Sequence, residues 1–146
     1  VVNNLIGDCD SIGILTLKIT DRSVNGRPTT SRHSRIYNNL FHLERPIEIR
    51  DEENISDNNV FSADFDLSGW QTGGYDRNSK LLDFTITLDR DNVCLRIESQ
   101  SPVPVFGNKP LAEFDFYGNP RVKDVTAGPF QDRFVNPVIL NIDPRK

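Results

Sequence analysis

Residues 69–78 hold the mixture of side chains that can recognise a sugar. The segment contains the only tryptophan of the chain among three glycines and several planar polar groups. An aromatic ring stacks on the apolar face of a sugar, and planar polar groups hydrogen-bond its hydroxyls. We therefore expect a glycan or protein partner to bind here, through Trp70, Gln71, Tyr75, Asp76, Arg77 and Asn78. The alternative is that Trp70 covers one end of the hydrophobic core.

Charge is distributed unevenly along the chain. Residues 22–35 carry four arginines and no acidic residue, whereas residues 51–66 carry six acidic residues and no lysine or arginine. The simplest interpretation is a solvated surface in both places. The sharper one is a positive loop that meets an anionic partner, or two complementary patches that join subunits. On the sharper interpretation, Arg32 and Arg35 belong to the binding surface.

The two cysteines, Cys9 and Cys94, predict a disulfide, with two free thiols as the alternative. Cys94 is out of phase with Val93 and Leu95 in an alternating segment, so it faces the polar side and does not fill the core. A bridge to Cys9 would close a long loop, worth ~4–5 kcal/mol in the chain-entropy model. It would also imply an oxidising compartment, so we expect an extracellular or surface-exposed protein. The sequon Asn54-Ile55-Ser56 matters only in a glycosylating pathway.

Sequence patterns for catalysis or metal binding are weak. His33 and His42 have no zinc-motif spacing, and no Gly-x-Ser-x-Gly motif occurs. The pairs Asp64/Asp66 and Glu113/Asp115 have the i, i+2 spacing that a strand places on one face, but a solvated strand face produces such pairs without any glycosidase function. We expect no catalytic residue, no metal and no cofactor. A hydrolase that acts on glycans is the least favoured interpretation.

Composition narrows the class of protein. The chain has 146 residues, 26% of them charged, and a net charge of −4. This charge excludes a basic nucleic-acid binder, and the absence of any apolar run of 18 residues excludes a membrane-spanning helix. Methionine is absent throughout, which suggests a processed chain or an excised domain. The length predicts a single domain over residues 1–146.

Period-2 alternation of apolar and polar residues dominates the sequence and predicts strands. Self-similarity at periods of 20–50 residues is not apparent, and turn signals separate the alternating segments. We therefore predict an all-β domain, an antiparallel β-sandwich (jelly-roll or Ig-like) of seven to nine strands, with Phe114 and Phe116 facing the core. The expected strands are 14–20, 46–50, 61–67, 82–88, 93–98, 113–116 and 138–142, with shorter candidates at 103–106 and 133–135.

One segment has a different period. Between residues 31 and 43, Ile36, Leu40 and Leu43 recur at helical spacing, and Thr30 or Ser31 is a suitable N-cap. This pattern predicts a short helix, and the alternative is a long loop anchored by apolar residues.

These observations favour a non-enzymatic recognition module that binds a glycan or protein partner through its end loops. The alternative is a structural subunit of an extracellular assembly, such as a pilin-like, fibre or virion-surface domain that forms homo-oligomers. Residues 114–120 and the strand expected after them resemble the C-terminal hairpin of minor pilins and pseudopilins. We assign no family from so short a segment.

Overall fold

The computed structural model describes residues 1–7, 10–17, 23–28, 33–51, 53–107, 112–121, 124–131 and 137–142. The predicted all-β class is confirmed, because the described elements are short strands and a single six-residue helix. The elements are β1 (Leu5–Gly7), β2 (Ile14–Thr16), β3 (Ser23–Val24), β4 (Arg27–Pro28), β5 (Arg35–Tyr37), β6 (Leu40–His42), β7 (Ile47–Ile49), β8 (Ile55–Asp57), β9 (Val60–Ser62), α1 (Leu67–Thr72), β10 (Lys80–Leu82), β11 (Phe84–Asp89), β12 (Cys94–Ser99), β13 (Val105–Phe106), β14 (Val125–Thr126) and β15 (Val138–Asn141).

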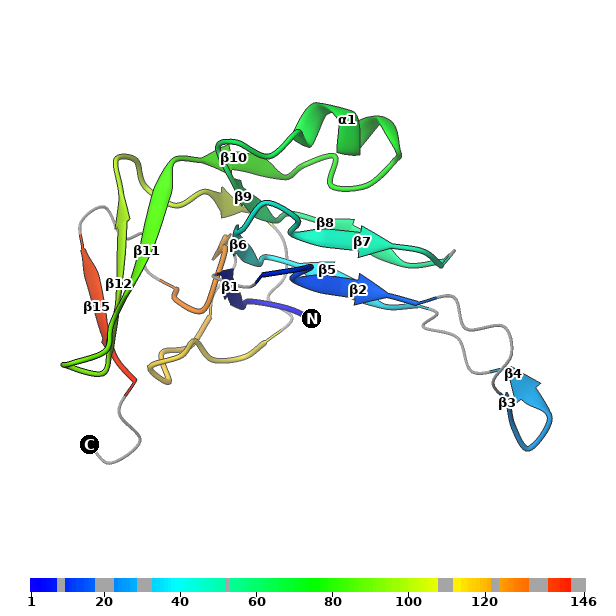
Figure 1. The fold of residues 1–146 in the computed structure, drawn as a ribbon, viewed down its shortest axis with the longest axis horizontal. Coiled ribbons are helices and arrows are strands. Elements are labelled where there is room, and N and C mark those ends of the chain that lie inside the picture. Colours follow the sequence, from blue (N-terminus) through cyan, green and yellow to red (C-terminus); the bar gives the residue numbers. More distant parts are fainter. Residues whose placement is uncertain are drawn as a thin grey trace.

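The N-terminal part of the chain winds into stacked coils. Strands β1, β6, β9 and β10 form a parallel four-stranded sheet, and the pairs β2–β7 and β5–β8 are parallel as well (Figure 1). Successive turns of the chain therefore place equivalent strands on one another, as in a parallel β-helix. This corrects the expected antiparallel arrangement for the described strands from β1 to β10, apart from the small β3–β4 hairpin.

The coils repeat every 20 residues, which corrects the expectation that the chain has no internal repeat. Asn39 hydrogen-bonds Asn59, and Asn59 hydrogen-bonds Ser79, each pair 20 residues apart. The first coil is longer: Asn4 and Asn39 are 35 residues apart. The additional residues include the β3–β4 hairpin, which lies away from the stacked coils in Figure 1. This insertion and the shortness of each strand hide the repeat from a search based on hydrophobicity.

The predicted helix over residues 31–43 is wrong, because its described part forms strands β5 and β6. Asn38 lies between the two strands with a positive φ of 56°, a conformation that breaks a helix and turns the chain. The helix found among the described residues lies elsewhere. It begins after Asp66, whose side chain accepts a hydrogen bond from the backbone N–H of Gly69, and it takes the place of a strand in the third coil (Figure 1).

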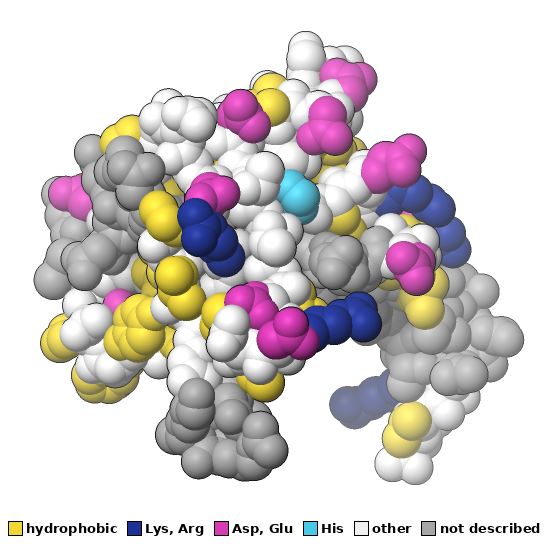
Figure 2. Space-filling model, turned by 60° about the vertical axis from the view of Figure 1, so that its left-hand side comes forward, with side chains coloured by type: hydrophobic (Ala, Val, Ile, Leu, Met, Phe, Trp, Pro, Cys, Tyr) yellow, Lys and Arg dark blue, Asp and Glu magenta, His cyan; other side chains and the backbone are white. Residues whose placement is uncertain are grey.

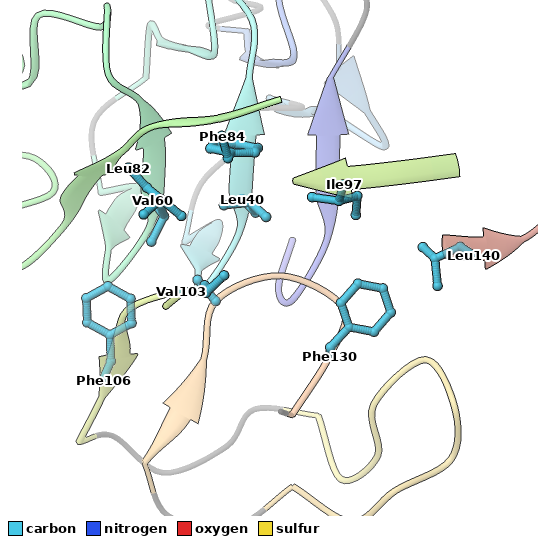
Figure 3. Packing of buried hydrophobic residues seen from close by; sticks show 10 residues of the cluster. Leu40, Val60, Leu82, Phe84, Ile97, Val103, Phe106, Phe130 and Leu140 are labelled. Atoms are coloured by element: carbon cyan, nitrogen blue, oxygen red, sulfur yellow. The ribbon is translucent and has the colours of Figure 1, made fainter. Parts of the chain in front are cut away.

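The C-terminal half is antiparallel, as expected, and it covers the outer face of the β6–β9 sheet. Strands β11, β12 and β15 form one antiparallel sheet, and β13 pairs with β14. Leu40 and Val60 point out of the coils toward Val103 and the C-terminal segments (Figure 3). We call this the outer core; its buried members are Leu40, Val60, Leu82, Phe84, Ile97, Val103, Phe106, Ala127, Phe130 and Leu140.

A second cluster, the inner core, fills the inside of the coils. Phe41 and Phe61 stack there with ring centroids 5.1 Å apart, and Ile36, Ile47 and Leu67 complete its buried part. Strands β6 and β9 are thus buried on both faces, which is typical of parallel sheets. Phe114 and Phe116 were expected in a core, but they are 58% and 59% exposed and lie outside both clusters.

Candidate functional site

A buried asparagine ladder links the coils. The side-chain Oδ1 of Asn39 accepts hydrogen bonds from the backbone N and the Nδ2 of Asn4, at 3.0 and 3.1 Å. The Oδ1 of Asn59 accepts the same pair from Asn39, at 2.9 and 3.0 Å. Each asparagine therefore satisfies buried backbone and side-chain groups of the coil before it, and this holds the coils in register.

The ladder ends at Asp76, one of the residues predicted to contact a ligand. Its carboxylate accepts hydrogen bonds from Asn59 Nδ2 at 2.8 Å, Ser79 Oγ at 2.6 Å and Trp70 Nε1 at 2.8 Å. Asp76 is 1% exposed, so it belongs to the scaffold and no ligand reaches it. A negative charge held by three donors is a strong anchor for the end of the stack.

Trp70 and Gln71 also support this end of the ladder. Besides its bond to Asp76, Trp70 packs against the inner core and stacks on Tyr75, with ring centroids 5.0 Å apart. Gln71 donates to the backbone carbonyl of Asp76 at 2.8 Å. The contacts of Trp70 therefore agree with the alternative expectation that this residue covers the core. Its indole ring also holds the ring of Tyr75 in place.

The outer face of the β5–β8 sheet brings predicted and unexpected residues together. Within each strand the central residue, Ile36 or Ser56, is buried, and its neighbours point outward. The third coil continues the stack, because the backbone N–H of Asp76 donates to the carbonyl of Ser56 at 2.8 Å. We call the resulting surface the outer strip; it consists of Arg35, Tyr37, Ile55, Asp57, Tyr75 and Arg77.

Local interactions fix the polar groups of the outer strip. Both carboxylate oxygens of Asp57 accept hydrogen bonds from Asn78, at 2.8 Å from its backbone N and 2.7 Å from its Nδ2. Burial raises the pKa of the Tyr37 hydroxyl, and the nearby carboxylate of Asp57 raises it further, while Arg35 acts in the opposite direction. The phenol is therefore neutral and available as a hydrogen-bond donor well above physiological pH.

A groove of about 560 Å³ adjoins the outer strip at Arg77. Arg77 and Lys80 supply two exposed cations, and the ammonium of Lys80 lies 5.8 Å from the centre of the Phe106 ring. None of the described residues that line this groove is acidic. Its lining consists of Asn58, Arg77, Asn78, Ser79, Lys80, Val105, Phe106 and Gly107.

Other predicted residues lie apart from this region or cannot be placed. Arg32 and Cys9 lie outside the described residues, and Cys94 is half-buried with a free thiol, so the predicted disulfide has no support. Asn54 of the sequon is buried, with its Oδ1 accepting from the backbone of Ser34 and its Nδ2 donating to the carbonyl of Asp51. The folded chain therefore does not present Asn54 for glycosylation.

The sequence interpretation missed Tyr37, Asn58, Lys80 and Phe106. The signal that could have found the first three is the pair Asn38-Asn39, which recurs 20 residues later as Asn58-Asn59. Aligning the chain on these pairs places residues 37, 57 and 77 at equivalent positions. Phe106 carries no such signal, because it reaches the groove from the C-terminal half.

Within the described residues, no group of three or more histidine, cysteine, aspartate and glutamate side chains is arranged to hold a metal ion. Nor does this part of the chain contain a helix of the length and apolar character needed to cross a membrane. Comparison with family models, with curated proteins and with solved structures finds no match to this chain.

Proposed function

We propose that this chain is a non-enzymatic recognition module, displayed on a surface or secreted, that binds an acidic glycan along the outer strip and in the adjoining groove. The observation that carries this proposal is the 20-residue repeat, which gathers Arg35, Tyr37, Tyr75 and Arg77 on one face. Neighbouring strands in a sheet lie ~4.8 Å apart, so the three coils present a row in which the rings and cations of the first and third coils flank Ile55 and Asp57 of the second. An extended polymer suits such a row.

The charges favour an anionic sugar over a neutral one. Arg77 and Lys80 line the groove, and none of the described residues that line it is acidic. A guanidinium binds a carboxylate or sulfate through two parallel hydrogen bonds, and the ring of Tyr75 offers a flat apolar surface next to it.

The alternative of a glycan hydrolase has less support. Two of the carboxylates singled out for it have structural partners: Asp66 caps α1, and Asp115 accepts hydrogen bonds from the backbone N–H groups of Tyr117, Asn119 and Gln131. A carboxylate occupied in this way is poorly suited to proton transfer or attack on a sugar.

The test is a binding titration with uronic-acid and sulfated oligosaccharides, and with neutral ones as a comparison. We expect Arg77→Ala to weaken the affinity for the acidic series roughly 10- to 100-fold, because it removes a charge-assisted hydrogen bond. Lys80→Ala should weaken it less and should reduce its dependence on salt. The matched control is Arg90→Ala, in the exposed turn between β11 and β12, which should leave the affinity unchanged.

Unfolding curves of the variants separate binding from stability. The side chains of Arg77 and Lys80 are exposed, so both variants should unfold at the same denaturant concentration as the parent chain. Equal affinity for acidic and neutral sugars, or an Arg77→Ala variant that binds as well as Arg90→Ala, would refute the proposal.

A further inference from the structure

Charge alternates along the outer strip from one coil to the next. The first coil presents Arg35 and the third presents Arg77, whereas the second coil, which lies between them, presents Asp57. Asp57 is opposite Tyr37 in the register of β5 and β8. Besides burial, the Asp57 carboxylate raises the pKa of the Tyr37 hydroxyl, so its charge acts on the neighbouring coil. The order of charges across the three coils is therefore positive, negative, positive.

The two cations of the outer strip have no acidic partner in the described part of the chain. Arg35 and Arg77 are exposed, and no described acidic side chain forms an ion pair with either of them. On the face that Figure 2 draws, by contrast, lysine and arginine side chains mostly lie beside acidic ones. The ion pair between Arg96 and Glu98 is of that kind. An unpaired guanidinium can bind a carboxylate through two parallel hydrogen bonds.

The second coil has the surface that a neutral sugar needs. Ile55 is 49% exposed and offers an apolar contact for a sugar ring or a methyl group. Each carboxylate oxygen of Asp57 accepts one hydrogen bond from Asn78 and retains capacity for another, which a sugar hydroxyl can donate. An acidic sugar at this position would instead place its carboxylate against that of Asp57, and like charges at an interface are unfavourable.

The spacing of the coils suits a glycan that crosses them. Neighbouring strands lie ~4.8 Å apart, and one pyranose unit of an extended chain has nearly the same length. Three successive sugars can therefore lie on the three coils, one on each. A glycan that followed a single strand would meet only two outward side chains, because β5 and β8 are three residues long and the central residue of each is buried.

We propose that the outer strip selects an unbranched glycan in which acidic sugars alternate with neutral ones. This selectivity rests on the proposed function and specifies the ligand of that same site. Arg35 and Arg77 bind the carboxylates of two acidic sugars. The neutral sugar between them lies on Ile55 and donates a hydrogen bond from a hydroxyl group to Asp57.

The first measurement compares three hexasaccharides by calorimetric titration: glucuronic acid alternating with N-acetylglucosamine, galacturonic acid alone, and N-acetylglucosamine alone. We expect the alternating hexasaccharide to bind about tenfold more tightly than the all-acidic one, although it carries half as many charges, because only the latter places a carboxylate against Asp57. The neutral hexasaccharide should bind most weakly.

The length of the glycan tests whether both cations act together. An alternating tetrasaccharide can reach Arg35 and Arg77 at once, whereas a disaccharide cannot, so the tetrasaccharide should bind at least about tenfold more tightly. Arg35→Ala should remove most of this difference. The side chain of Arg35 is exposed, so the variant should unfold at the same urea concentration as the parent chain.

Asp57→Asn tests the negative charge of the second coil, because it removes the charge with little change of shape. We expect this variant to bind the all-acidic hexasaccharide about tenfold more tightly than the parent chain does, and to change the affinity for the alternating one less than about threefold. Asp91→Asn, which neutralises an exposed carboxylate in the β11–β12 turn, is the matched control and should change neither affinity. Both glycans are measured on the same variant, so a loss of stability cannot imitate a change in the ratio of their affinities.

The outcomes separate this selectivity from glycan binding itself. If no acidic oligosaccharide binds, both the proposed function and the selectivity are wrong. If acidic oligosaccharides bind but the all-acidic hexasaccharide binds as tightly as the alternating one, the proposed function stands and the selectivity is refuted. A change of both affinities by the same factor in Asp57→Asn would refute it as well.

Discussion

At the scale of single residues, paired asparagines determine where the coils turn and how they stack. In Asn38-Asn39 and Asn58-Asn59 the first residue adopts a positive φ, which asparagine tolerates better than most residues. The second enters the ladder. The two roles are distinct, so each pair turns the chain and joins it to the next coil.

Asn59 makes hydrogen bonds to several buried groups, so replacing it should destabilise the fold. Its Nδ2 has two N–H groups, which lie within hydrogen-bond distance of three buried acceptors: the carbonyl of Ile36, the hydroxyl of Ser56 and the carboxylate of Asp76. Asn59→Ala removes this donor from all three buried groups and removes the Oδ1 that accepts from Asn39, so we expect the free energy of unfolding to fall by about 3–5 kcal/mol. Urea denaturation measures the change. The control Asn92→Ala, in the exposed β11–β12 turn, should cost less than about 1 kcal/mol; equal effects would show that the ladder contributes little.

At the scale of elements, the sequence predicted the long strands better than the short ones. β11 and β12 lie close to their predicted positions, because one face of each meets the core and alternation is clear. Three-residue strands such as β6 and β9 are buried on both faces, so they show no alternation. The expected strand over residues 61–67 ends early for a different reason: Asp66 caps a helix that begins at Leu67.

The turn around Asp115 shows how one carboxylate can organise a segment that has little regular secondary structure. Asp115 accepts from the backbone N–H groups of Tyr117 and Asn119 and from the side chain of Asn119. Arg121, also buried, donates to the backbone carbonyl of Gly128 at 2.9 Å. Together they hold residues 113–121 and 124–131 against the outer core, leaving Phe114 and Phe116 exposed at the surface.

This arrangement predicts a dependence of stability on acid. Burial raises the pKa of Asp115, but the hydrogen bonds from Asn119, Gln131 and Tyr117 outweigh it, so the folded-state pKa lies below the usual value for an aspartate carboxyl group. A carboxyl group with a lowered pKa stabilises the fold above its unfolded-state pKa, and this contribution is lost as pH falls through the folded-state pKa. Asp115→Asn should therefore flatten the loss of stability below about pH 4, measured by urea denaturation at several pH values.

Asp89 provides the comparison for that experiment. Its pKa is also lowered, by hydrogen bonds from Asn92, but it lies in an exposed turn. Asp89→Asn should change the loss of stability at acidic pH much less than Asp115→Asn, because solvent screens the interactions of an exposed group. If the parent chain and Asp115→Asn lost stability equally as the pH falls, the Asp115 carboxylate would not organise the segment.

At the scale of the whole molecule, the limits of the sequence interpretation have a physical cause. Alternation reports which residues are buried but not which strands pair, so the all-β class was predictable and parallel stacking was not. In the candidate site, some residues could be found from the sequence and others only from the fold. Tyr75 and Arg77 were found from their chemistry, whereas Tyr37 and Lys80 join them only through the coil repeat. Phe106 joins them only because the C-terminal half folds back onto the coils.

The outer core joins the coils to the C-terminal sheet, so we expect the molecule to unfold as one unit. Leu140 of β15 and Leu40 of β6 belong to the same buried cluster (Figure 3). Leu140→Ala should lower the free energy of unfolding by about 2–5 kcal/mol. The fluorescence of Trp70, which packs on the inner core, should report the same shifted midpoint as far-UV circular dichroism. Ile139→Ala, on the exposed face of the same strand, should change neither signal. If Trp70 kept its parent midpoint while circular dichroism split into two transitions, the coils would be stable without the sheet that covers them, and the shared core would not couple the two halves.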